Sequence, residues 1–173
     1  MRVLLVNESW FGNGRAIADA VVSGIVEVIG DSEVSIVEAS KAPETLPGEL
    51  VALIVSSPTH ELSLPTPKTR NSALAQGGTG DAERGLAEWI RGVEPVRDLP
   101  VFAMDTCTKI SSIIGSASKA AVKELKKRGF NDVHRAPSFL VGGTEGPLGT
   151  GELERARNWG RELAQGVLES MSA

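Results

Sequence analysis

The opening stretch of the chain constrains the fold more than any other part of the sequence. Residues 2–6 form a short run, mostly apolar, with the length of a buried strand, and residues 7–14 after it are mainly small or polar. A helical pattern begins directly afterwards, at Arg15. A strand, a small-residue loop and a helix start in this order present backbone N–H groups and the positive end of a helix to an anion. The opening therefore predicts a phosphate site.

The rest of the chain alternates between strand and helix patterns. Helical spacing or helix-end signals are found at 14–29, 86–93 and 115–128, and again over the closing residues, where Trp159 is expected in the core, as is Trp89 in the second of these helices. Apolar runs predict further strands at 33–37, 50–55, 101–104 and within 130–141, the last of them interrupted near Pro137. This alternation predicts five parallel strands with helices on both faces, in a single domain spanning residues 1–173.

Composition excludes several classes of protein. The net charge is −4, which argues against a nucleic-acid partner or an anionic membrane surface. One cysteine, Cys107, and two histidines cannot form a disulfide or a usual zinc site. No run approaches the ~20 apolar residues that cross a bilayer. We therefore expect a cytosolic protein with no membrane or nucleic-acid partner, monomeric or weakly dimeric.

Three loops are predicted to form the binding site. In an open parallel sheet, ligands bind beyond the carboxyl ends of the strands. The loops at that edge are residues 7–14, 56–61 and 105–114. Residues 56–82 show the least regular pattern of the chain, and a long irregular segment of this kind is usually functional or mobile.

Two common phosphate motifs are absent or weak in the first loop. A Walker A loop requires G-x-x-x-x-G-K-[ST], and the chain has no such string. The dinucleotide fingerprint G-x-G-x-x-G is matched only by Gly12 and Gly14, which come late after the strand, although Glu38 ends the second strand where a ribose-binding acid is expected. What remains is a cradle for a single terminal phosphate.

The stretch from Val6 to Val21 resembles the signature of the flavodoxin-like family, in which a strand is followed by T-x-T-G-N-T and a helix. Ser9, Gly12 and Asn13 match this signature in kind, whereas Phe11 and Gly14 replace two hydroxyl residues. Weaker similarity continues through residues 57–60, from Asp105, and in residues 115–117 and 139–153, so the resemblance covers nearly the whole chain. It implies a three-layer α/β/α sandwich around a five-stranded parallel sheet of order 2-1-3-4-5.

The resemblance also implies flavin mononucleotide (FMN) as the cofactor. The phosphate would lie in loop 9–14 and the ring between loops 56–61 and 105–114. Both ring loops lack Tyr, Trp and Phe, so His60 is a candidate to stack on the ring and Trp10 a candidate to reach it. Cys107 is expected to be a bystander near the ring, and Lys109 to offer charge there or lie in solvent. The implied binding residues are Ser9, Trp10, Phe11, Gly12, Asn13, Gly14, Ser57, Pro58, Thr59, His60, Asp105, Thr106 and Cys107.

Three functions follow from this resemblance. The leading one is electron transfer by bound FMN to or from a redox partner protein, with no catalytic residue. The second is an FMN-dependent NAD(P)H or quinone-type reductase, in which residues 61–82 form a substrate lid. The third is a flavodoxin-fold interaction domain that has lost FMN.

Overall fold

The computed structural model describes residues 2–172 and contains one sheet of five parallel strands in the order β2-β1-β3-β4-β5. The strands β1, β3 and β4 are each paired on both edges, and their two faces are covered by separate hydrophobic cores, which explains why their buried residues are mostly apolar. The predicted fold class and strand order are confirmed. The strands are β1 (Arg2–Asn7), β2 (Val34–Glu38), β3 (Leu50–Pro58), β4 (Val101–Cys107) and β5 (Val133–Leu140).

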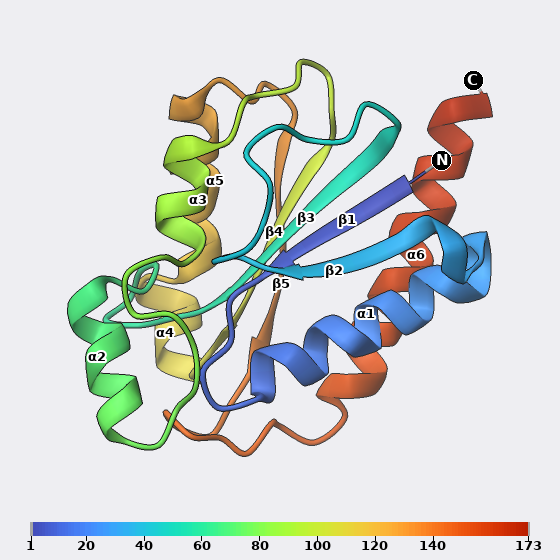
Figure 1. The fold of residues 1–173 in the computed structure, drawn as a ribbon. Helices are drawn as coiled ribbons and strands as arrows, with labels where there is room; N and C mark the ends of the chain where they lie inside the picture. Colours follow the sequence, from blue (N-terminus) through green and yellow to red (C-terminus); the bar gives the residue numbers. More distant parts are fainter. Residues whose placement is uncertain (1, 173) are drawn as a thin grey trace.

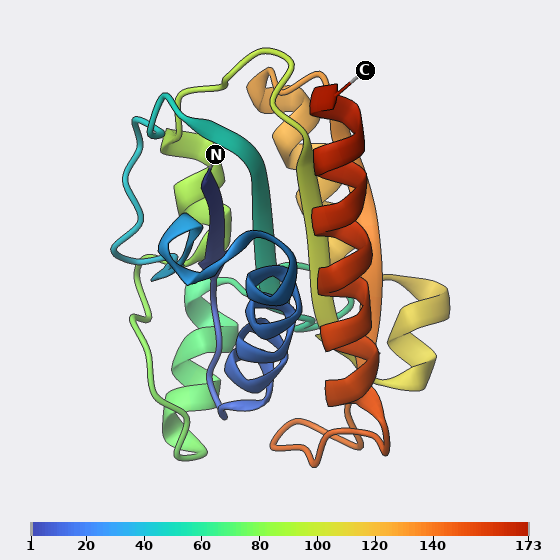
Figure 2. The same cartoon turned by 90° about the vertical axis from the view of Figure 1, so that its right-hand side faces the viewer.

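Helices cover both faces of the sheet (Figures 1 and 2). α1 (Asn13–Ile29) and α6 (Glu152–Ser172) pack on one face, where Ile17, Val21 and Leu163 join its core. α3 (Leu86–Gly92) and α5 (Ala117–Arg128) cover the other face, around Trp89 and Leu125. α2 (Pro67–Ala75) and α4 (Lys109–Ile114) lie beyond the carboxyl ends of the strands (Figure 1). A short 3-10 turn, Asp31–Glu33, leads into β2.

Two strands extend further than the apolar pattern predicts. Ser57 pairs with Asp105 and Pro58 with Thr106, so these polar residues are the last rungs of the β3–β4 ladder. Loops 56–61 and 105–114 therefore begin as strand, because backbone hydrogen bonding continues after the apolar run has ended. The expected interruption of the last strand is present, since the β4–β5 register shifts across the segment that contains Pro137.

The irregular segment 56–82 contains a helix, α2, that apolar periodicity does not reveal. Pro67 occupies its first turn, and Thr66 and Thr69 form a reciprocal capping box at its start. The helix has few apolar side chains, and its buried residues are Thr69, Arg70 and Ala73. The prediction that residues 56–82 are irregular is therefore wrong for 67–75, which form a helix anchored by a buried arginine.

α1 and α6 cross at a pair of glycines. A Cβ atom on Gly24 would lie 2.0 Å from the carbonyl oxygen of Arg157, and one on Gly160 would lie 2.2 Å from that of Val21. Beside this crossing, Arg157 and Arg161 donate from their Nε atoms to the two carboxylate oxygens of Glu27. The backbones of the two helices therefore touch, and this contact fixes α1 against α6.

Candidate functional site

The loop between β1 and α1 presents free backbone donors. Gly12, with φ of 85°, caps α1 in the left-handed conformation. The amides of residues 10–14 have no hydrogen-bond acceptor within residues 2–172. Ser9 Oγ accepts from the Arg15 amide at 3.1 Å, so its own proton remains available for a ligand. A loop of amides at a helix N-terminus is a site for an anion.

The position of Ser9 leaves little room for a side chain at Gly14. A Cβ atom at Gly14 would lie 3.3 Å from Ser9 Oγ. Asn13 does not cap its own helix, because its Nδ2 atom donates to the carbonyl oxygen of Glu145 at 3.0 Å. The first loop is thereby tied to the loop that follows β5.

The end of β3 carries the second predicted loop. Thr59 is fixed at both ends, since its amide donates to the Thr106 carbonyl and its Oγ1 accepts from the amide of Ala117. His60 and Ser63 then pair across a two-residue turn in which Glu61 and Leu62 both have positive φ. Burial is the main reason that the pKa of His60 is lowered from its ordinary value. The imidazole is therefore mostly neutral at neutral pH.

The end of β4 carries buried residues of the third predicted loop. Asp105 is buried, and its Oδ2 atom accepts from the amide of Ser118 at 2.7 Å, which ties β4 to the start of α5. The thiol of Cys107 is also buried, and burial, reinforced by the charge of Asp105, raises its pKa to about 11. Because the thiolate is the nucleophile, this environment suits a bystander rather than a reactive cysteine.

The three strand ends converge on one cavity of about 390 Å³. Of the residues predicted for the site, it is lined by Trp10, Phe11, Asn13, Gly14, Pro58, Thr59, His60, Thr106 and Cys107. Ser9 and Gly12 instead line a neighbouring crevice of about 740 Å³, which Trp10 also borders. Ser57 and Asp105 line neither space. Ser57 is buried and donates to the carbonyl of Pro58 at 3.2 Å.

Residues in or directly after α2 and in the loop after β5 also line the cavity. The sequence predicts a part for the first group only in the reductase hypothesis, as a substrate lid, although the Thr66-Pro67 pair is a recognisable helix-start signal. The loop after β5 enters the prediction only through the wider resemblance. These additional lining residues are Lys68, Thr69, Ser72, Ala73, Gln76, Val141, Gly143 and Thr144.

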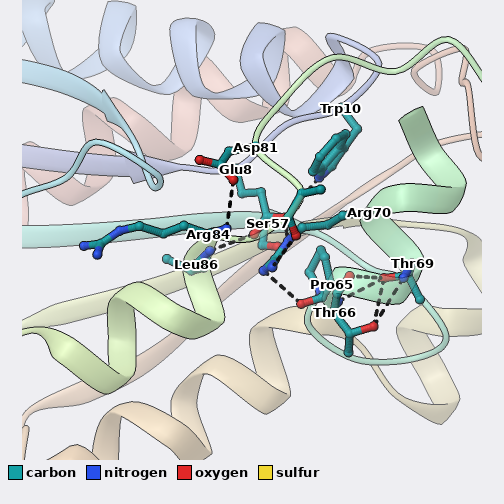
Figure 3. A network of polar contacts seen from close by, with 12 residues as sticks. Glu8, Trp10, Ser57, Pro65, Thr66, Thr69, Arg70, Asp81, Arg84 and Leu86 are labelled. Atoms are coloured by element: carbon teal, nitrogen blue, oxygen red, sulfur yellow. Dashed lines mark hydrogen bonds and ion pairs between the residues drawn. The ribbon is translucent and has the colours of Figure 1, made fainter. Parts of the chain in front are cut away.

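A buried ion pair attaches α2 to the first loop (Figure 3). Arg70, whose side chain has no exposed surface, donates from Nε to Glu8 Oε1 at 2.8 Å and lies 2.7 Å from Glu88 Oε2. Glu8 also accepts from the indole of Trp10 at 3.0 Å and from the amide of Leu86 at 2.7 Å. Burial by itself lowers the pKa of Arg70, but its bonds to Glu8 and Glu88 outweigh burial and raise it.

Trp10 is part of this network rather than a free surface residue. Its side chain is only 3% exposed, and its ring packs closely on Gly80, where an added Cβ atom would lie 3.1 Å from the ring. The indole lines the cavity on one side and is held by Glu8 below. The other two tryptophans lie elsewhere. Trp89, on α3, is fully buried in the hydrophobic core on that face of the sheet, and Trp159 packs edge-on to Phe102.

The part of the chain that the structure describes shows neither a metal-binding cluster nor a membrane-spanning helix. No three His, Cys, Asp or Glu side chains in residues 2–172 are grouped so that they could hold a metal ion. Among the same residues, no helix has the length and apolar character needed to span a bilayer.

Comparison with solved structures identifies the fold. A flavodoxin from the domain Archaea superimposes with a TM-score of 0.59 over 96% of this chain and 99% of its own, at 17% identity. Oxidised flavodoxin 1 from Bacillus cereus gives a TM-score of 0.60 over 95% and 98%, at 13% identity. This chain has the flavodoxin-like fold. The flavodoxin-like chain also matches the flavodiiron protein of Giardia intestinalis, with a TM-score of 0.59 and 18% identity over 97% of its length, but it spans only 36% of that protein.

Comparison by sequence adds nothing to this assignment. No protein-family model and no curated protein matches the chain. The flavodoxin-like fold thus rests on the strand order, on the helix layers and on the solved structures that share them.

Proposed function

We propose that this flavodoxin-like protein binds FMN non-covalently in the 390 Å³ cavity and serves as an electron carrier. The observation that carries the proposal is the loop of residues 10–14. Its five consecutive amides lack protein acceptors, they lie at the start of α1, and three residues of this loop beyond Trp10 line the cavity. An anion at a helix N-terminus is favoured by these donors and by the helix dipole.

The residues present fit the chemical parts of FMN. A phosphate has donors in the amides of the loop residues that line this cavity, Phe11, Asn13 and Gly14, whereas the hydroxyl of Ser9 faces the neighbouring crevice. The walls supply polar groups from Thr59, Thr106 and the half-buried imidazole of His60. Bound FMN supplies one- and two-electron redox chemistry. The chain itself binds and orients, and no acid, base or nucleophile of the site is needed, which agrees with the high pKa of the Cys107 thiol.

The proposal predicts that binding depends on the phosphate. The fluorescence of FMN should be quenched as the protein is added. Riboflavin has the same ring without the phosphate and should bind at least ~10-fold more weakly. It lacks the charge-assisted hydrogen bonds to the loop, which are worth about 1.5–3 kcal/mol each. Fluorescence titration measures both affinities. Equal affinities for the two flavins would mean that the loop does not hold phosphate, and absence of binding to either would leave the interaction-domain hypothesis.

A matched pair of variants tests the loop itself. Gly12→Ala forces a Cβ into the left-handed cap of α1 and should weaken FMN binding several-fold. Gly151, with φ of 80°, precedes α6 in the same way, and as at Gly12 no atom lies within 4 Å of an added Cβ. Gly151→Ala should therefore lose comparable stability, about 1 kcal/mol, while FMN affinity stays unchanged. If both variants bind FMN like the parent, the phosphate lies elsewhere.

Steady-state assay of the FMN-loaded protein separates the carrier from the reductase hypothesis. A carrier should not oxidise NADH or NADPH with a quinone or dye unless a partner reductase is added. Turnover by the protein alone would favour the reductase.

A further inference from the structure

α4 exposes an unusual concentration of apolar surface. Ile110, Ile113 and Ile114 are 69%, 74% and 66% exposed, and Leu62, at 43%, lies against the end of the same helix. These four residues are called the α4 patch below. Figure 2 shows α4, in yellow, standing out from the body of the molecule. Clustered exposed apolar side chains of this kind mark interaction sites, whereas single ones do not.

The helices at the α4 patch are rich in lysine although the whole chain is acidic, and two of these lysines, Lys109 and Lys119, lie at the patch. Lysines occur at positions 41, 68, 109, 119, 123, 126 and 127, so five of the seven fall in α4 and α5. Residues 109–128 carry six basic side chains and one acidic side chain, Glu124, but Lys126, Lys127 and Arg128 occupy the last turn of α5, at the end away from the patch. Lys119 is held at the patch itself, because its Nζ donates to the carbonyl of Ile113 at 3.1 Å.

The α4 patch borders the candidate flavin cavity. Cys107 and Thr108 line the cavity immediately before α4 begins, and Glu61 lines it immediately before Leu62. Glu61 is the acidic residue of this border, and it lies on the cavity side of the patch. A protein that covers the α4 patch would therefore be brought to the mouth of the cavity.

We propose that the α4 patch with Lys109 and Lys119 is the docking surface for the redox partner, and that this partner presents an apolar centre flanked by acidic side chains. The partner's chemistry follows from charge complementarity, which sets orientation and association rate. The net charge of −4 alone points instead to a basic partner. A second copy of the chain is disfavoured, because Lys109 and Lys119 of the two copies would be brought together across the contact.

This inference rests on the proposed electron-transfer function, but the surface can be tested without flavin. The probe is cytochrome c in two forms that share one fold: the native protein, which is basic, and a lysine-succinylated form, which is acidic. Isothermal titration calorimetry at low salt should show binding of the succinylated form at least ~10-fold tighter than of the native form. The affinity should fall as salt is added.

Two independent variants locate the binding. Replacing Ile110, Ile113 and Ile114 together by Ser removes the apolar centre, and Lys109→Gln with Lys119→Gln removes rim charge while keeping the isoleucines. Each should weaken binding of the succinylated probe by at least ~10-fold. Controls are Leu168→Ser with Met171→Ser, exposed apolar residues of α6, and Lys41→Gln beyond β2. The controls should bind like the parent.

Several outcomes would overturn the proposal. Equal or tighter binding of native cytochrome c contradicts an acidic partner, and binding that survives both patch variants places the contact elsewhere. Sedimentation with vesicles of equimolar phosphatidylcholine and phosphatidylserine, lost in the isoleucine variant, would assign the patch to a membrane. A dimer in light scattering that this variant dissociates would assign it to a second copy. Failure of FMN to bind would refute the proposed function and leave these measurements intact.

Discussion

His60 is the titratable side chain that lines the candidate flavin cavity with a lowered pKa. Burial is the largest cause, the charge of Arg70 acts in the same direction, and Glu8 and Glu61 oppose it. A histidine whose folded pKa lies below the ordinary value of 6.5 binds fewer protons in the folded than in the unfolded state as pH falls. Its burial therefore costs no stability above pH 6.5 and an increasing amount below it.

We predict that the free energy of unfolding decreases below pH 6.5 in part because of His60. His60→Gln should flatten this decrease, since a glutamine does not titrate. Urea unfolding at a series of pH values measures the effect, and NMR titration of the imidazole measures the pKa directly. A measured pKa at or above 6.5 would contradict the prediction.

At the scale of elements, α2 is held to the rest of the site by a buried charge rather than by an apolar face. Arg70 joins α2 to Glu8 at the end of β1 and to Glu88 on α3, and it also donates to the carbonyl of Pro65 at 3.0 Å. The bonds from Arg70 and from the amide of Gly85 outweigh burial and lower the pKa of Glu88. The contribution of Glu88 is thus complete above its ordinary pKa and is lost as the pH falls through the lowered value.

Removing one member of this network should be costly. Arg70→Met leaves the carboxylate of Glu8, which is 6% exposed, without its cation and should destabilise the protein by about 3–5 kcal/mol. Adding Glu8→Gln to Arg70→Met should recover part of that loss. Chemical denaturation of both variants gives the two values. Arg91→Met, which removes an exposed partner of Glu88, is the control and should change stability by less than about 1 kcal/mol.

If Arg70→Met unfolds like the parent, α2 is held by its capping box and packing alone. Because α2 contributes cavity-lining residues, the destabilised variant should also bind FMN more weakly even under conditions where it remains folded. The double variant, which restores neutrality, should regain affinity in step with stability.

At the scale of the whole molecule, the strand order and the three converging loops were predictable because strand and helix patterns alternate clearly along the chain. The roles of Ser57 and Asp105 were not predictable, because a polar residue after an apolar run indicates a loop. In the structure both residues extend the sheet and are buried. The α2 helix was not predicted because the side chain that anchors it is an arginine, so it shows no periodic apolar pattern. The partner of Arg70 lies 62 residues away, at Glu8, and no local pattern reports such a contact.

The crossing of α1 and α6 joins the first and last helices of the described chain and should be intolerant of any side chain. Gly24→Ala places a methyl group 2.0 Å from a carbonyl oxygen, so we expect a loss of about 3 kcal/mol, the upper end of the usual cost of overpacking. Gly166→Ala, in α6 with no atom within 4 Å, should instead gain up to about 1 kcal/mol. Thermal unfolding compares the two, and equal effects would show that the helices can separate at little cost.

This backbone contact also limits how the sequence can change over evolutionary time. Gly24 and Gly160 each press on the partner helix, so a larger residue at one position cannot be offset by shrinking the other, which has no side chain to lose. Homologues that keep this crossing should retain glycine at both positions even where the loops that line the cavity have diverged beyond recognition. In this fold the oldest surviving signal of common ancestry would then lie outside the candidate flavin cavity, in two residues whose nearest neighbours across the crossing are backbone atoms.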